Sequence, residues 1–152
     1  MSLYVLTGDD SLIIDGFPLS NFFAGTDYVT IDLPNDSASL DTSKDGNSVW
    51  SDNQEGNNGD LTMKLMAGSG GDIFCNGLVV NQKQDFVASG LREGIFKKRL
   101  GDENGNVKYD TYTLEGGKMI NYSGGIGDAK GNTEQGMKTY VIRFAKIDRA
   151  VL

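Results

Sequence analysis

Residues 59–66 read Gly-Asp-Leu-Thr-Met-Lys-Leu-Met, and from Asp60 onward apolar and polar side chains alternate. A period of two is typical of a strand that has one dry face and one wet face. The dry face holds Leu61, Met63 and Leu65, and the wet face holds Thr62 and Lys64. The stretch is therefore predicted to be a half-buried strand, and it sets the pattern to look for elsewhere in the chain.

The same alternation occurs in two other segments, residues 26–33 and 138–146. Val29, Ile31 and Leu33 share a face in the first, opposite Tyr28, Thr30 and Asp32, and Tyr140, Ile142 and Phe144 share a face in the second. Further strands are expected at residues 4–7, 11–17, 87–100 (with a break at Gly90 or Gly94) and 108–114. The pair Asn104-Gly105 is the strongest short-range signal for a hairpin turn.

One helix is expected, over residues 71–84, with Ser69 as its N-cap and Ile73, Phe74 and Leu78 on its packed face. Gly77 inside it lowers helix stability by about 1 kcal/mol relative to Ala, so this helix needs a sheet to pack against.

Composition agrees with a single, mainly β domain over residues 1–152. Only 38% of the residues are hydrophobic, while Gly supplies 21 residues and Pro only 2. This mixture favours strands, turns and polar loops over a helical bundle. No apolar run approaches the ~18 residues that a membrane-spanning helix needs, and we expect a soluble protein made in a reducing cytosol, with no membrane partner.

The chain contains no His and one Cys. Catalytic triads of the usual kind and common transition-metal sites depend on His, so no catalytic residue, metal or cofactor is assigned and an enzyme is the least favoured class. Cys75 has no partner for an internal disulfide and is expected to be a small core residue.

Residues 34–59 form a long polar segment that we interpret as an extended acidic loop. Its acids are Asp36, Asp41, Asp45, Asp52 and Glu55, against the single base Lys44. Loops of this length are uncommon in compact domains unless they are functional or disordered. Trp50 is its most prominent apolar group, and we expect it to anchor on another subunit. A second polar stretch, residues 116–136, is rich in Gly.

Charge is distributed unevenly. Residues 1–60 contain eleven acids against the single base Lys44, whereas residues 61–152 contain thirteen bases and ten acids. The only basic cluster comprises Arg92, Lys97, Lys98 and Arg99. We expect these four cations to meet acidic residues of a neighbouring copy, as in head-to-tail docking. A solvated acidic surface that merely aids solubility is the simpler alternative.

Two other interpretations of the acidic segment stay open. The run from Asp41 to Asp52 imitates a calcium-binding loop, although Asp stands where Glu is usual and no helices flank it. A receptor- or glycan-binding β-sandwich module of a fibre or baseplate is the alternative function, with a site built from Trp50, Asn53, Gln54, Asn57 and Asn58.

The order of these features resembles the tail tube proteins of contractile-tailed bacteriophages, which are related to type VI secretion tube proteins. The likeness is carried by Ser11-Leu-Ile-Ile-Asp-Gly-Phe17, the strand ending at Leu33, the polar loop with Lys44-Asp-Gly-Asn-Ser48, the strand 59–66 and its following helix, the Asn104-Gly105 hairpin and the closing strand 138–146.

The resemblance implies two packed antiparallel sheets, a β-sandwich or partial barrel, with one flanking helix and a long inter-strand loop that reaches neighbouring subunits. It further implies a virion protein, assembled in the bacterial host cytoplasm, whose six-membered rings stack into a hollow tube for genome ejection. The implied partners are other copies, tail sheath protein, tape measure protein, baseplate hub and tail terminator, with DNA in transit.

Four polar residues on the wet faces of two predicted strands are hypothesised to line the channel: Thr30, Asp32, Thr62 and Lys64. An acidic or neutral lining would repel phosphate within the ~8 Å screening length. Lys64 departs from that pattern, and a pair with Asp32 across neighbouring strands would neutralise it.

Overall fold

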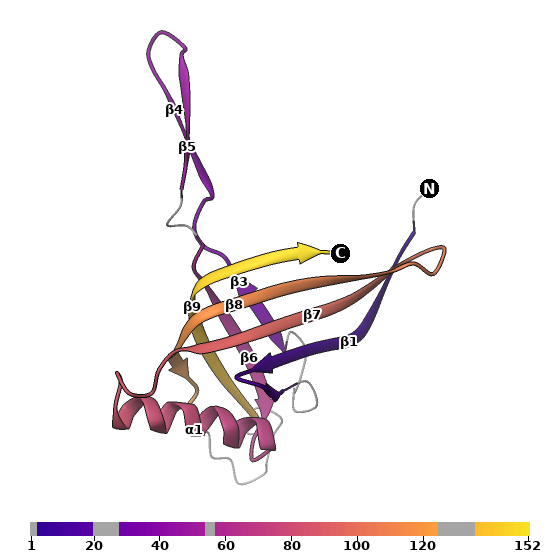
Figure 1. Cartoon of the computed structure of the whole chain (residues 1–152), viewed down its shortest axis with the longest axis vertical. Coiled ribbons are helices and arrows are strands. Elements are labelled where there is room, and N and C mark those ends of the chain that lie inside the picture. Colours follow the sequence, from indigo (N-terminus) through magenta and orange to yellow (C-terminus); the bar gives the residue numbers. More distant parts are fainter. Residues whose placement is uncertain (1–2, 20–27, 54–56, 125–135) are drawn as a thin grey trace.

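The computed structural model describes residues 3–19, 28–53, 57–124 and 136–152, and its side chains except those of residues 7–9. The described part contains nine strands and one helix (Figure 1): β1 (Tyr4–Ile14), β2 (Phe17–Pro18), β3 (Val29–Asp32), β4 (Ala38–Thr42), β5 (Ser48–Asp52), β6 (Gly59–Met66), α1 (Gly70–Gln84), β7 (Arg92–Asp102), β8 (Val107–Tyr122) and β9 (Met137–Val151). The predicted mainly β class with one helix is confirmed.

Seven strands form one antiparallel sheet in the order β2-β1-β7-β8-β9-β6-β3, and β4 and β5 form a separate two-stranded sheet. The large sheet is bent where its two long strands, β8 and β9, change direction side by side (Figure 1). Gly116 lies at the bend with φ +69°, a conformation that side chains rarely adopt, and faces Ala145 of β9.

The bend divides the sheet into two layers. The long layer comprises β1, β7, residues 107–115 of β8 and residues 146–151 of β9; the short layer comprises β3, β6, residues 117–122 of β8 and residues 137–144 of β9. Leu12 and Ile14 of the long layer and Leu61, Met63 and Leu65 of the short layer lie in one buried cluster. The two predicted packed sheets are thus two halves of one bent sheet that does not close into a barrel.

Helix α1 closes one end of the core. Ser69 caps it by accepting a hydrogen bond from the Asp72 amide at 3.3 Å, as predicted. Cys75 and Val79 are buried in the core, which confirms the prediction for Cys75, and Phe74 stacks on Phe17 with ring centroids 4.4 Å apart. Ile73 was predicted on the packed face, but it is 67% exposed because the buried stripe runs through residues 71, 75 and 79.

Several strand boundaries differ from the prediction. β1 is one strand with an irregularity between Leu6 and Asp10, where two strands were expected. β7 begins only at Arg92, since residues 86–89 form turns after the helix. β8 continues through Tyr122, beyond the predicted end at 114, because Met119 and the residues around it pair with β9. The start of the predicted strand at residues 26–27 lies outside the described residues.

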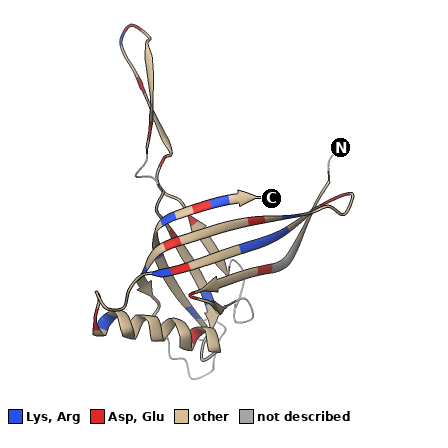
Figure 2. Ribbon diagram, in the orientation of Figure 1, with Lys and Arg blue, Asp and Glu red and all other residues tan. Residues whose placement is uncertain are grey.

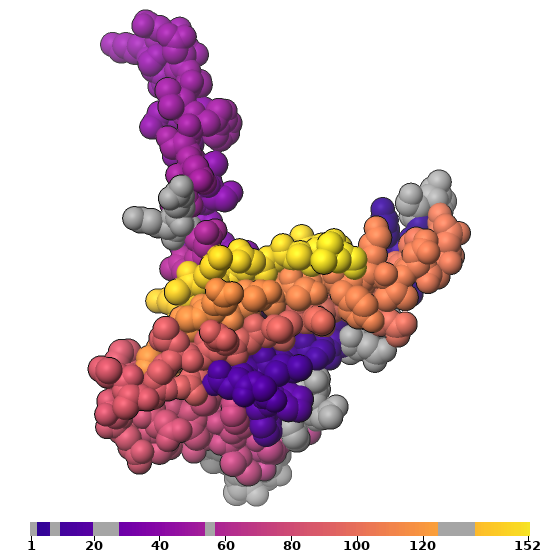
Figure 3. Space-filling view, in the orientation of Figure 1, coloured from indigo at the N-terminus to yellow at the C-terminus, as the bar shows by residue number. Residues whose placement is uncertain are grey.

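Within the predicted acidic loop, residues 38–52 form a β-hairpin. Strands β4 and β5, residues 38–52, form what we call the arm, which projects from the body (Figures 1 and 3). Gly46 at its tip has φ +83°, and the Gly46 amide donates to the Ser43 carbonyl oxygen at 3.0 Å. Every arm residue is exposed, so the hairpin makes no contribution to the core of its own subunit.

Candidate assembly surfaces

The long layer has two strand edges that the described residues leave partly uncovered. On the β1 side, β2 pairs only with Ile13 and Ile14, and the Leu19 amide donates to the Leu12 carbonyl oxygen at 2.9 Å. Within the described residues, no strand covers that edge from Tyr4 to Ser11.

On the β9 side, β6 pairs only as far as Phe144. The Ile147 amide still donates to the Asn57 carbonyl oxygen at 2.9 Å, whereas Leu152 and Tyr109 exchange hydrogen bonds with each other across β8 and β9. Because amides along a strand point alternately to its two sides, those of Arg149 and Val151 point away from β8. No described residue accepts from them.

Both uncovered edges carry exposed apolar residues. Leu3, Tyr4, Val5 and Leu6 are consecutive and exposed at the start of β1, and Val151 and Leu152 are exposed at the end of β9. Unpaired edges of this kind invite pairing with another chain unless charge or a covering segment protects them. The geometry therefore marks β1 and β9 as candidate joining edges.

The predicted basic cluster is divided between two faces of the sheet. Figure 2 shows basic residues along β7. Lys97 and Arg99 lie on the face of β7 that points away from the core, where Lys97 is in register with Ser11 and Thr111. Lys98 lies on the core side. Arg92 is engaged within its own chain, donating to an Asp15 carboxylate oxygen at 2.9 Å and to the Ser89 carbonyl oxygen.

A polar row crosses the core side of the long layer above the apolar core. Asp10, Lys98 and Asp110 are in register on β1, β7 and β8. The Tyr28 hydroxyl donates to Asp10 at 2.6 Å, which raises the pKa of Tyr28 to about 12 chiefly through this hydrogen bond. At the other end of the row, Arg149 donates to both carboxylate oxygens of Asp110, at 2.8 and 3.1 Å.

The four proposed channel residues lie together on the outer face of the short layer. Thr30 is directly opposite Thr62, and Asp32 is opposite Asp60. The suggested pair between Asp32 and Lys64 is wrong: the register places Lys64 beyond Thr62, near Tyr28 at the other end of β3. Asp60 is instead paired with Arg143, whose guanidinium donates to it at 2.8 and 3.2 Å.

The acidic residues of the arm do not converge. Asp41 is in register with Val49 on one face of the hairpin, whereas Leu40, Trp50 and Asp52 lie on the other. Asp36 and Asp45 lie at its base and tip, and Glu55 and Gln54 lie outside the described residues. Among the described residues, no group of three acids or thiols has the spacing of a metal site. Asn53 donates to the Asp36 carbonyl oxygen, and Asn58 accepts from Asn35 rather than joining Trp50.

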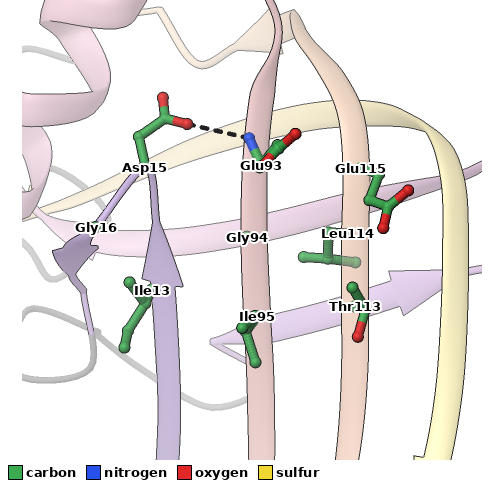
Figure 4. Close-up of a pocket in the computed structure, with 9 residues that line it drawn as sticks. All are labelled: Ile13, Asp15, Gly16, Glu93, Gly94, Ile95, Thr113, Leu114 and Glu115. Atoms are coloured by element: carbon green, nitrogen blue, oxygen red, sulfur yellow. Dashed lines mark hydrogen bonds between the residues drawn. The ribbon is translucent and has the colours of Figure 1, made fainter.

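A shallow hollow lies where the outer face of the long layer meets the β1–β2 turn (Figure 4). Its floor is apolar, with Ile13, Ile95 and Gly94, and Glu93 and Glu115 stand at its rim. Asp15 is already satisfied, because it accepts from the Glu93 amide at 3.0 Å and from Arg92. The hollow thus adds an acidic end to a face that carries Lys97 and Arg99 farther along β7.

The described part of the chain has no helix long and apolar enough to span a membrane.

Neither a family model nor a curated protein matches this sequence. Solved structures do share its fold. A chain of an extracellular contractile injection system, the PVC sheath-tube complex in its extended state, matches with a TM-score of 0.57 at 11% identity, over 94% of this chain and 88% of that one. A chain of the PVC sheath/tube terminator gives 0.57 at 10% identity, over 93% and 92%.

A chain of the anti-feeding prophage cap, which terminates a tube, gives a TM-score of 0.53 at 13% identity, over 84% of this chain and 91% of that one. The tail-tube resemblance drawn from the sequence is thus confirmed at the level of the fold.

Sequence patterns did not reveal the two joining edges. They become visible only once β6 is seen to stop at Phe144 of β9 and β2 to cover only the end of β1. The one available signal was the run of apolar residues at the start of the chain, which continues as an exposed strand.

Proposed function

We propose that this chain is the subunit of a hollow tube, in which copies join edge to edge into rings and the rings stack. One observation carries the proposal: the long layer is a four-stranded antiparallel sheet whose two edges, on β1 and on β9, are left partly open by the described residues. In the order β1-β7-β8-β9 the first and last strands run in opposite directions. The β9 edge of one copy can therefore pair with the β1 edge of the next and continue the same antiparallel sheet.

Such head-to-tail contacts use two different surfaces on each copy, and they close into a ring if the rotation between copies allows it. A barrel with an open channel needs roughly 16 or more strands. Four strands per copy reach that size with about four copies, and the six copies implied by the family resemblance exceed it. Closure also removes the exposed edges of the free subunit.

In the proposed ring, one face of the long layer lines the bore. Strands β6 and β3 and helix α1 cover the core side of this layer, so a free passage requires the opposite face, which carries Ser11, Lys97, Arg99 and Thr111. The hypothesis of a bore lined by Thr30, Asp32, Thr62 and Lys64 places it on the other layer. These two assignments exclude each other, because the core separates the two faces.

The finer parts of the proposal follow the family resemblance. They are stacking of six-membered rings, passage of DNA during genome ejection, location in a virion tail, and contacts with sheath, tape measure, baseplate hub and terminator proteins. The fold shared with chains of sheath-tube and terminator assemblies supports a structural role of this type.

The experiment is to block one edge without disturbing the subunit. Val151→Pro removes an amide that points away from β8 and that donates to no described residue. We expect the variant to retain the wild-type melting temperature and to remain monomeric in light scattering at concentrations where the wild type forms large assemblies. Assemblies of wild-type size from Val151→Pro would contradict edge pairing through β9.

A further inference from the structure

The sequence contains three Asn-Gly pairs, Asn58-Gly59, Asn76-Gly77 and Asn104-Gly105. An asparagine side chain reacts most readily with its own backbone in this pair, because glycine has no Cβ atom to shield its amide nitrogen. The reaction brings that nitrogen against the side-chain amide carbon of the asparagine, which requires the backbone between the two residues to rotate. The surroundings of each pair therefore decide how fast it reacts.

Two of the pairs are held in regular structure. Gly59 is buried in β6, where a Cβ atom would lie only 2.6 Å from the Asp32 carbonyl oxygen, and the side chain of Asn58 accepts a hydrogen bond from Asn35. The pair Asn76-Gly77 lies inside α1. An amide inside a helix donates to the carbonyl oxygen four residues earlier, so the Gly77 nitrogen is fixed along the helix axis. Rotation at either pair requires a strand or a helix to open.

The third pair lies in the β7–β8 turn, and both of its residues are exposed. The side chain of Asn104 makes no hydrogen bond with any described residue, so its amide group is free to turn. The Gly105 amide donates to the Asp102 carbonyl oxygen at 3.3 Å, which is longer than a usual N–H···O bond. A Cβ atom on Gly105 would meet nothing within 4 Å. The attacking nitrogen and its target are thus both accessible and weakly held.

We propose that Asn104 is a site of spontaneous modification, at which the folded protein converts asparagine into aspartate and isoaspartate. The Gly105 nitrogen forms a bond to the side-chain amide carbon of Asn104, and the amino group of that side chain leaves as ammonia together with the proton of the Gly105 amide. The product is a five-membered cyclic imide. Water then opens the imide at either of its two carbonyl groups, which gives aspartate or isoaspartate.

The conversion changes the turn in two ways. A new carboxylate appears two residues from Asp102, whose own carboxylate accepts from the amides of Asn104 and Asn106 at 2.9 Å. In isoaspartate the main chain also runs through the former side chain and is one carbon longer, so these two amides can no longer keep their places around Asp102. The conversion takes place within one subunit and does not depend on the proposed function.

The direct test is site-resolved peptide mapping by mass spectrometry after the purified, folded protein has been kept warm at mildly alkaline pH. Conversion at Asn58 and Asn76 should wait for local opening of β6 or α1, so Asn104 should convert at least about tenfold faster than either. The matched control is the same chain in concentrated urea, where the three pairs should convert at similar rates. Folded protein in which Asn104 stays intact, or converts no faster than the other two, would overturn the proposal.

A variant tests whether the turn sets the rate. Asp102→Ala removes the carboxylate that accepts from the amides of Asn104 and Asn106, and it should speed conversion of Asn104 in the folded protein by about threefold or more through freer local opening. In urea, where no turn persists, the variant and the wild type should convert Asn104 at equal rates. An equal or lower rate in the folded variant would overturn the assignment of the turn as the controlling feature.

Discussion

Gly117 and Gly77 differ in the space that surrounds their Cα atoms. A Cβ atom on Gly117 would lie 2.5 Å from the buried ring of Phe144 and 3.0 Å from Ile142, so this strand position has no room for a side chain. A Cβ atom on Gly77 of α1 would meet nothing within 4 Å. The first glycine is required by packing, and the second only weakens the helix.

We therefore expect opposite effects from the same substitution. Gly117→Ala should lower the free energy of unfolding by about 1 to 3 kcal/mol through overpacking. Gly77→Ala should raise it by up to about 1 kcal/mol through helix propensity. Urea denaturation of both variants checks this, and equal effects of the two substitutions would contradict the packing around Phe144.

Tyr28 ties the segment before β3 to β1 through its hydrogen bond with Asp10. The raised pKa of Tyr28, about 12 against an ordinary value of 10.0, means that folding favours the protonated phenol. Its contribution to stability is fully present below pH 10 and is lost as the pH rises from 10 toward 12.

Tyr28→Phe should remove this dependence. Across the window from about pH 10 to pH 12, the free energy of unfolding should fall more steeply in the wild type than in the variant. Groups common to both proteins cancel in the comparison. Parallel curves over this window would show that the phenol of Tyr28 is not held by Asp10.

At the scale of the elements, alternation and turn residues correctly predicted features that depend on neighbouring residues in the sequence. The wet and dry faces of β6 and the Asn104-Gly105 turn agree with the structure, where Gly105 has φ +81°. The arm was missed as a hairpin because its residues are exposed on both faces, which leaves no alternation to detect. The end of β8 was missed because its last residues are held by pairing with β9, a contact distant in sequence.

Only those features of the candidate surfaces that depend on local sequence could be predicted. The acidic arm and the exposed Trp50 could be anticipated from composition. The division of Lys97, Lys98 and Arg99 between two faces could have been anticipated from strand alternation once β7 was placed. Which edges stay uncovered depends on strand order, and that order arises from long-range pairing that no local pattern encodes.

The carboxylate of Asp102 holds the β7–β8 turn together. Asp102 accepts hydrogen bonds from the amides of Asn104 and Asn106 and from the Asn106 side chain, all at 2.9 Å. These bonds lower the pKa of Asp102, chiefly through the Asn106 side chain. Its contribution is thus present above the ordinary pKa of an aspartate and is lost as the pH falls through the lowered value.

Asp102→Ala should loosen this turn and leave the core intact. We expect faster amide hydrogen exchange at residues 103–107, with exchange at core strands such as β6 unchanged. Asp45→Ala, at the tip of the arm, serves as the control, because the Asp45 side chain makes no comparable set of bonds among the described residues. Unchanged exchange at the turn in Asp102→Ala would contradict the role of the carboxylate.

At the scale of the whole molecule, the two candidate positions of the bore place opposite faces of the subunit in the channel. Lys97→Cys places a thiol on the face assigned here to the bore, and Thr30→Cys places one on the opposite layer. Both positions are exposed in the single subunit. The native thiol should stay unreactive in both, because burial and the charge of Asp72 raise the pKa of Cys75 to about 12.

In assembled tubes, a small maleimide should label both variants. A maleimide on a long polymer should label Thr30→Cys readily and Lys97→Cys slowly, because the polymer must enter through the tube ends. Separate subunits should show no such difference. The reverse order of labelling would support the alternative bore lined by Thr30, Asp32, Thr62 and Lys64.

The central claim is that identical copies complete each other's sheet around a hole. It is tested most directly by cryo-electron microscopy of the concentrated, purified protein at a resolution that separates strands. We predict rings or rods whose wall is one continuous antiparallel sheet, with β9 of each copy hydrogen-bonded to β1 of the next. Solitary subunits at every concentration, or rings in which these two strands remain unpaired, would contradict it.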